Sequence, residues 1–171
     1  AFVYLAQAIK QTVNIPVITC QRINDPDLAE GIIQNKKADF VAMGRPFLAD
    51  PEFPRKAQEG RSKEIRPCTA CNQGCYDAAF SLSPITCLLN PRTARKREMV
   101  IAEAPKKEKI LVIGGGPAGM EVAREMALRG HRVSLFEKGE RLGGLMWLAS
   151  RCPGREEFAA ALDYYIHQLS I

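Results

Sequence analysis

The chain has 171 residues, of which 46% are apolar and 25% are charged, and its formal net charge is +5. This length and apolar content suffice to bury a core, and no apolar run approaches the roughly 20 residues of a membrane-spanning helix, so a disordered chain and a membrane-spanning protein are both excluded. The N-terminal residues lack the basic region and the cleavage site of a signal peptide, and we therefore expect a cytoplasmic protein.

The N-terminal third alternates between helical and strand patterns. Apolar residues recur at helical spacing in residues 2–13, and an Asp-Pro step signals the start of a helix at Asp25 and again at Asp50. Two short apolar runs, Pro16–Cys20 and Asp39–Met43, indicate buried strands between these helices. Strands that alternate with helices at this spacing predict parallel β/α units, in which functional residues follow the carboxyl ends of the strands.

An arginine follows each of the two predicted strands. Arg22 lies after the first strand, and Gly44 and Arg45 lie after the second. A glycine lets a backbone N–H approach a phosphate, and an arginine adds a charge that can bond two phosphate oxygens. These residues are candidates for a phosphate site, although solvated arginines at two surface turns would give the same pattern.

Four of the six cysteines form a C-x2-C-x3-C-x11-C array, in which Pro67 and Gly74 supply bends. Thiolates that share a short loop can bind one inorganic centre with little further loss of chain entropy. Zinc sites usually pair two C-x2-C steps, whereas three near cysteines and one distant cysteine are typical of [4Fe-4S] ligation. The array therefore favours an iron-sulfur cluster, with zinc, a disulfide or unliganded thiols as alternatives. The array cysteines are Cys68, Cys71, Cys75 and Cys87.

A basic connector, Arg92–Lys109, follows the array and holds seven basic residues against three glutamates. It could attract the phosphates of a nucleotide or of coenzyme A, but a solvated linker explains the same charges. Because no aromatic residues are interleaved with these charges, we do not expect nucleic-acid binding.

The segment after the connector predicts a nucleotide-binding turn. An apolar strand beginning at Lys109 leads into the pattern G-x-G-x-x-G, and a helix follows. The glycines Gly114, Gly116 and Gly119 allow the tight turn, the approach of a pyrophosphate and the close packing of the helix on the strand. A second strand ends at Glu137, 18 residues after Gly119, where a carboxylate can accept hydrogen bonds from an adenosine ribose and would repel a 2′-phosphate.

Several other polar residues are expected to have structural roles only. The isolated histidines satisfy local hydrogen bonds, and the lone cysteines are small buried or half-buried side chains. Two tyrosines pack in a last helix that begins after Pro153, and two aspartates cap helices. These residues are His131, His167, Cys20, Cys152, Tyr164, Tyr165, Asp25 and Asp50.

The run Asp39–Pro51 resembles the last strand of the flavin-binding barrel in the Old Yellow Enzyme family. The cysteine array, with the following Ile85–Pro91, is similar to the branch of that family that contains 2,4-dienoyl-CoA reductase, enoate reductase and trimethylamine dehydrogenase. The resemblance covers nearly the whole chain and implies an α/β fold in three parts. These are the last two β/α units of a TIM barrel (1–65), an iron-sulfur loop segment with the start of a linker (66–100), and the N-terminal part of a Rossmann-like FAD-binding domain (101–171).

The same resemblance implies cofactors for the candidate residues. Arg22, Gly44 and Arg45 would hold the phosphate of FMN, the four array cysteines would hold a [4Fe-4S] cluster, and NAD(P)H would donate the hydride. The Gly143-Gly144 pair resembles flavoprotein sequences that contact FAD, so the glycine turn is assigned to FAD. The FAD residues are then Gly114, Gly116, Ala118, Gly119, Glu137, Lys138, Gly143 and Gly144.

The implied function is reduction of enoate or 2,4-dienoyl-CoA double bonds, with the cluster relaying electrons between FAD and FMN. The alternatives are an amine dehydrogenase of the trimethylamine dehydrogenase type, a non-catalytic electron-transfer module and a zinc-stapled module. A TIM barrel and a complete Rossmann domain both need more residues than the chain supplies. We therefore expect an internal fragment that is inactive alone, exposes apolar edges and could form a homo-oligomer. The substrate-binding site and the catalytic residues would belong to the missing barrel region.

Overall fold

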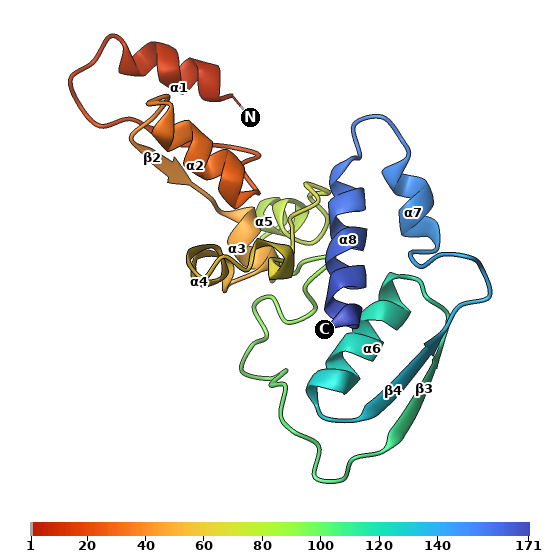
Figure 1. Cartoon of the computed structure of the whole chain (residues 1–171). Helices are drawn as coiled ribbons and strands as arrows, with labels where there is room; N and C mark the ends of the chain where they lie inside the picture. Colours follow the sequence, from red (N-terminus) through yellow and green to blue (C-terminus); the bar gives the residue numbers. More distant parts are fainter. Residues whose placement is uncertain (1) are drawn as a thin grey trace.

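The computed structural model describes residues 2–171, and it has an α/β fold with two separate parallel sheets at opposite ends of the molecule (Figure 1). In the N-terminal sheet, β1 (Ile18–Cys20) pairs with β2 (Phe40–Ala42). In the C-terminal sheet, β3 (Lys109–Ile113) pairs with β4 (Arg132–Phe136). The predicted α/β class is confirmed.

Strand register brings the residues after each pair of strands together. Cys20 lies opposite Ala42 at the end of the first sheet, and Ile113 lies opposite Phe136 at the end of the second. Because both pairs are parallel, the loops that follow the two strands leave from the same edge. The candidate phosphate residues and the glycine turn are thus each placed at one edge of a sheet.

Helices α1 (Val3–Lys10) and α2 (Pro26–Gln34) contact the N-terminal sheet. Asp25 caps α2, since its side chain accepts hydrogen bonds from the backbone N–H groups of Asp27 at 2.7 Å and Leu28 at 3.0 Å. The predicted cap is confirmed. The small core of this part contains Ile23, Ile32 and Ala38.

Four short helical segments lie between the two sheets. They are α3 (Arg45–Ala49), α4 (Phe53–Gln58), a 3-10 turn (Ser62–Glu64) and α5 (Tyr76–Phe80). Of these, the sequence predicted only α4. Segments of three to five residues are too short to show a periodic apolar pattern, and they form here because the surrounding chain holds them in place.

Asp50 is buried, and it is the C-cap residue of α3 but not the N-cap of α4 that the sequence predicts. The residue at the start of α4 is Glu52, whose backbone N–H donates to Asp50 Oδ1 at 3.0 Å. Asp50 Oδ2 lies 2.6 Å from Lys56 Nζ and 2.9 Å from the backbone nitrogen of Arg66. Asp50 therefore connects α4 to the segment that enters the cysteine array.

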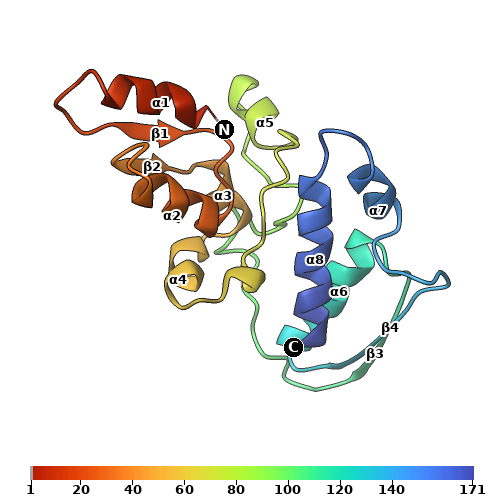
Figure 2. The ribbon, with the colours of Figure 1, turned by 45° about the horizontal axis from the view of Figure 1, so that its top comes forward.

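Helices α6 (Pro117–Leu128), α7 (Leu145–Ser150) and α8 (Glu157–Ser170) form the C-terminal half with the second sheet. Helix α8 lies beside both α6 and α7, as Figures 1 and 2 show from two directions. Leu89, two residues after the last array cysteine, is buried between them and attaches the end of the array to this half. The other buried residues of this core are Met120, Met146, Ala161, Leu162, Tyr164 and Tyr165.

Apolar side chains remain exposed on both sheets, which confirms the predicted apolar edges. The lone cysteines Cys20 and Cys152 are exposed, so the expectation that they are buried or half-buried is wrong. Cys20 shares the outward face of β1 with Ile18, because side chains alternate along a strand. Within residues 2–171, no helix is both long and apolar enough to cross a membrane. The large apolar strand residues that are more than half exposed are Ile18, Phe40, Leu111, Ile113 and Phe136.

Candidate functional site

The four array cysteines line one small cavity in the segment between the sheets, and all four are half-buried free thiols. Gly74 returns the chain toward Cys87, since its φ is +75° and its carbonyl oxygen accepts a hydrogen bond of 2.6 Å from the Thr86 N–H. A side chain at Gly74 would lie 2.3 Å from Thr86 Oγ1, so only glycine fits. This turn brings the distant fourth thiol beside the other three.

The Cys68 thiol shows how close the array thiols are. Burial raises the pKa of Cys68, and Cys87 and Cys71 raise it further because neighbouring negative charges repel. The backbone N–H of Ala70 and the guanidinium of Arg45 lower the pKa without reversing the shift. The neutral form of the Cys68 thiol is therefore favoured until a cationic centre binds, because metal binding stabilises the thiolate form.

No three His, Cys, Asp or Glu side chains in residues 2–171 converge as ligands of a single metal ion. A [4Fe-4S] cluster takes each thiolate at a different iron, so its ligands surround the cluster. Four half-buried thiols line one cavity, and thiolates are ligands of such clusters and of zinc.

The candidate phosphate residues lie together at the carboxyl ends of β1 and β2. Arg22, Gly44 and Arg45 line one cavity, with Asn24 and Cys68 beside them. Arg22 has a left-handed backbone with φ of 52°, which turns the chain sharply after β1. Open space surrounds the position where a side chain of Gly44 would project, so a ligand can approach its backbone closely.

Both arginines of this cavity also contact later parts of the chain. Arg22 forms an ion pair with Glu157, the first residue of α8, and Arg45 donates a hydrogen bond to Asn72 in the cysteine loop. The side-chain amide of Asn24 donates to the carbonyl oxygen of Cys68 at 3.0 Å. The edge of the first sheet is therefore connected directly to the cysteine loop and to α8.

The glycine turn joins the end of β3 to the start of α6. Gly114 has φ of +102°, which favours glycine, and α6 begins at Pro117. A methyl group on Gly119 would lie 1.9 Å from the carbonyl oxygen of Gly114. Nothing lies within 4 Å of the same position on Gly116. Gly119 thus permits the packing of α6 on the turn, and Gly116 leaves open space that a pyrophosphate could enter.

Glu137 is hydrogen-bonded to the same turn. Its Oε2 accepts from the Gly115 N–H at 2.7 Å, and its Oε1 accepts from the Gly139 N–H at 2.8 Å. The hydrogen bonds from Gly139 and Gly115 lower the pKa of Glu137, because they stabilise the carboxylate. Oε2 of Glu137 therefore fixes the glycine turn at the place where the sequence predicts a ribose, and Oε1 fixes the loop that follows β4.

The other predicted nucleotide residues surround this turn. The Gly143 N–H donates to the Gly115 carbonyl oxygen at 2.7 Å, and a methyl group on Gly144 would lie 3.3 Å from the Cα of Gly116. Ala118 lies in the first turn of α6, and Lys138 follows Glu137. The structure thus brings the eight predicted residues to one edge of the second sheet.

Replacing Gly119 with alanine is expected to lower the free energy of unfolding by about 1–3 kcal/mol, because the added methyl group must displace backbone atoms. Gly116→Ala is the matched variant, since its methyl group meets no atom of the protein. It should leave stability nearly unchanged and still weaken binding of the FAD that the sequence predicts, by occupying the open space. Urea unfolding and FAD titration of both variants test this, and equal losses of stability would contradict the assignment.

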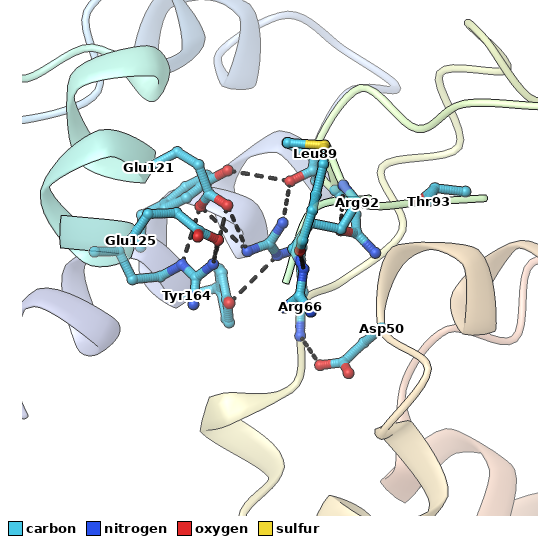
Figure 3. Close-up of polar contacts among 12 residues, drawn as sticks. Asp50, Arg66, Leu89, Arg92, Thr93, Glu121, Glu125 and Tyr164 are labelled. Atoms are coloured by element: carbon cyan, nitrogen blue, oxygen red, sulfur yellow. Dashed lines mark hydrogen bonds and ion pairs between the residues drawn. The ribbon is translucent and has the colours of Figure 1, made fainter. Parts of the chain in front are cut away.

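The sequence did not reveal a buried polar network around Arg66, which connects the cysteine segment with α6 and α8 (Figure 3). Nη2 of Arg66 lies 2.9 and 3.1 Å from the two carboxylate oxygens of Glu121 in α6. Nη1 donates to the Leu89 carbonyl oxygen, and Nε lies 3.3 Å from the hydroxyl of Tyr164 in α8. Arg124 also donates to both oxygens of Glu121, each at 3.0 Å.

Burial opposes the charges in this network, but the partners outweigh it. The pKa of Arg66 is raised by Tyr164 and Glu121, and the pKa of Glu121 is lowered by Arg124 and Arg66. Both groups therefore stay ionised near neutral pH. The one local signal was an arginine directly before Pro67 and the first array cysteine, and its partners lie too far along the chain to be read from spacing.

A cavity of about 650 Å³ is lined by none of the predicted site residues. Its wall contains several cations that are already paired, such as Lys56 with Asp50 and Arg124 with Glu121. No array cysteine, candidate phosphate residue or glycine-turn residue lines it, so this cavity belongs to none of the candidate sites.

In comparison with known proteins, the N-terminal and C-terminal parts of the chain match two different families. Residues 3–64 match the NADH:flavin oxidoreductase / NADH oxidase family, and residues 112–168 match an NAD(P)-binding Rossmann-like domain. The chain is 49% identical over 167 residues to a metal reductase of Desulforamulus reducens, and this alignment covers 98% of the chain and 25% of that protein.

Two solved structures are similar over nearly the whole chain. A 2-naphthoyl-CoA reductase gives a TM-score of 0.95 at 38% identity, over 99% of this chain and 26% of that one. A histamine dehydrogenase from Rhizobium sp. 4-9 gives a TM-score of 0.87 at 32% identity, over 97% of this chain and 25% of that one. The chain therefore spans about a quarter of the length of these relatives.

Proposed function

We propose a function from the premise that the chain joins part of an NADH:flavin oxidoreductase to part of an NAD(P)-binding Rossmann-like domain. In this proposal, residues 1–65 end an FMN-binding TIM barrel, residues 66–100 hold an iron-sulfur cluster and begin a linker, and residues 101–171 start an FAD-binding domain. The whole protein is then an oxidoreductase in which these residues carry electrons between two flavin sites.

The position of the four-thiol cavity carries this proposal. The cavity shares Arg45 and Cys68 with the candidate phosphate cavity at the first sheet. On its other flank, the cysteine segment is bonded to α6 through Arg66 and Glu121. An electron carrier between a flavin site and a second nucleotide site can act as a relay.

The residues of the chain would bind and orient the cofactors. When bound, the flavins supply both one-electron and two-electron chemistry, and the cluster passes one electron at a time. Arg22, Gly44 and Arg45 hold the FMN phosphate by charge and by an approachable backbone. The turn before α6 receives the FAD pyrophosphate at a helix N-terminus, and Glu137 fixes that turn beside the ribose.

We propose NAD(P)H-dependent reduction of an enoate or 2,4-dienoyl-CoA double bond as the reaction of the whole protein, and similarity to 2-naphthoyl-CoA reductase supports it. Similarity to histamine dehydrogenase supports an amine dehydrogenase as the second candidate. The substrate would bind to the part of the barrel that lies outside this chain, and the catalytic residues would belong to that part. Enoyl-CoA-dependent oxidation of NADH by the full-length protein supports the first candidate, and amine-dependent reduction of an electron acceptor supports the second.

The cytoplasm is the proposed location, since all six cysteines are free thiols and such thiols persist in reducing compartments. The exposed apolar strand faces support contact with further parts of the protein or with a second copy in a homo-oligomer. That the isolated chain is inactive, and that it does not bind nucleic acid, both stay predictions.

Metal analysis combined with an absorption spectrum tests the proposed relay. We expect about four irons and four acid-labile sulfides per chain, with a broad brown absorbance. The protein should be purified without oxygen so that an exposed cluster is not lost. Stoichiometric zinc without iron would contradict the relay and would favour a zinc-stapled module.

A further inference from the structure

Arg45 lies in the wall between two cavities. The cavity at the ends of β1 and β2 and the cavity of the four thiols share two lining residues, Arg45 and Cys68. Arg45 is the first residue of α3 and follows Gly44 directly, so strand β2 leads its side chain to this wall. The charge of Arg45 therefore acts on both cavities.

The charge of Arg45 is not offset by a carboxylate. Among the described residues, no Asp or Glu lies within ion-pair distance of Arg45, whose Nη1 donates to the neutral Oδ1 of Asn72. Arg22, in the same phosphate cavity, is instead paired with Glu157. Apart from the thiols, Arg45 is also the one charged residue that lines the four-thiol cavity.

Asn72 holds the Arg45 guanidinium at the cysteine loop. Asn72 lies between Cys71 and Cys75 and has a left-handed backbone with φ of 63°, which asparagine tolerates better than most residues. Its side chain accepts the hydrogen bond from Arg45. A surface arginine would normally extend its charged end into water, whereas this one is kept beside the thiols.

We infer that Arg45 raises the reduction potential of the cluster that the four thiols are proposed to hold, an inference that rests on the proposed function. One electron enters the cluster on reduction and adds one negative charge, while the bonds of the chain stay the same. A fixed positive charge nearby stabilises the reduced form, and half-burial weakens the screening by water. Arg45 would thus hold the flavin phosphate and also set the affinity of the relay for an electron.

The test is a reductive titration of the full-length protein with dithionite, followed by electron paramagnetic resonance of the cluster. Arg45→Gln is expected to shift the reduction equilibrium about tenfold toward the oxidised cluster, which is ~59 mV to lower potential for one electron. Arg45→Lys keeps the charge and should retain most of the wild-type potential. Arg95→Gln is the control, because Arg95 is an exposed arginine that lines neither cavity.

An Arg45→Gln potential equal to the wild-type or Arg95→Gln value would overturn the inference. So would an Arg45→Lys potential equal to that of Arg45→Gln, because the lost bond to Asn72 would then be the cause. If Arg45→Gln fails to retain iron, Asn72→Asp neutralises Arg45 in place and should lower the potential in the same direction. A wild-type protein without any cluster signal would instead refute the proposed function.

Discussion

Replacing Cys71 with alanine is expected to remove iron and acid-labile sulfide from the protein and to abolish its visible absorbance. Cys71 is one of the four half-buried thiols around the cavity, and no other cysteine lines that cavity. Loss of outer partners of metal ligands already costs about 10–100-fold in metal affinity, so loss of a direct ligand should cost more. Elemental analysis, a sulfide assay and an absorption spectrum measure the effect.

The same substitution should also loosen the cysteine segment. Metal binding to a loop contributes directly to its folding, and this segment has little regular structure besides the five-residue α5. We expect faster hydrogen exchange in residues 68–87 of the variant and little change in the two sheets.

Cys20→Ala and Cys152→Ala are the matched controls for Cys71→Ala. Both residues are exposed, and neither lines the four-thiol cavity. They should leave the iron content and the spectrum as in the wild type. Full iron content in Cys71→Ala, or equal iron loss in all three variants, would refute the assignment of the array as the cluster ligands.

Local sequence signals predicted the long elements because each depends on neighbours along the chain. The Asp-Pro step at Asp25 predicted the start of α2, because a cap needs only the next few backbone N–H groups. The glycine turn followed from steric demands within six residues, such as the contact between Gly119 and Gly114. The short helices α3, α5 and α7 were missed, because two turns or fewer show no apolar period.

Contacts between distant residues could not be predicted from one sequence. Arg66 and Glu121 are 55 positions apart, and spacing does not reveal such a pair. Asp50 looked like a helix cap, but its second oxygen is used by Arg66. The pairing of Arg22 with Glu157 likewise depends on how α8 packs near the first sheet. The sequence therefore identified which residues could bind ligands, and the structure adds what holds the candidate sites together.

Replacing Arg66 with alanine is expected to cause the largest loss of stability among single substitutions outside the cysteine array. Its guanidinium is buried and bonds Glu121, the Leu89 carbonyl oxygen and Tyr164 together (Figure 3). Removing one partner of a buried ion pair costs about 3–5 kcal/mol, because the other charge stays buried. Since Arg124 still pairs with Glu121, we expect a value near the lower end of that range. Urea unfolding at neutral pH, followed by circular dichroism, measures it.

Arg95→Ala is the control for removal of an arginine from an ion pair. Arg95 contacts Glu98 at 3.1 Å, but both side chains are exposed, so the expected change is within about 0.5 kcal/mol. A loss in Arg66→Ala as small as in Arg95→Ala would mean that the buried network contributes no net stability.

The pH dependence of this loss separates the ion pair from the other bonds of Arg66. Burial alone would raise the pKa of Glu121, but Arg124 and Arg66 lower it below its ordinary value of 4.5. A carboxylate with a lowered pKa stabilises the fold above its unfolded pKa and loses this contribution as the pH falls through the folded pKa. The difference in unfolding free energy between wild type and Arg66→Ala should therefore be nearly constant above the ordinary pKa of Glu121 and shrink as the pH falls through its lowered pKa in the folded protein. A difference that persists unchanged once the pH has fallen below the folded pKa of Glu121 would assign the contribution of Arg66 to Leu89 and Tyr164, because Glu121 would no longer carry its charge.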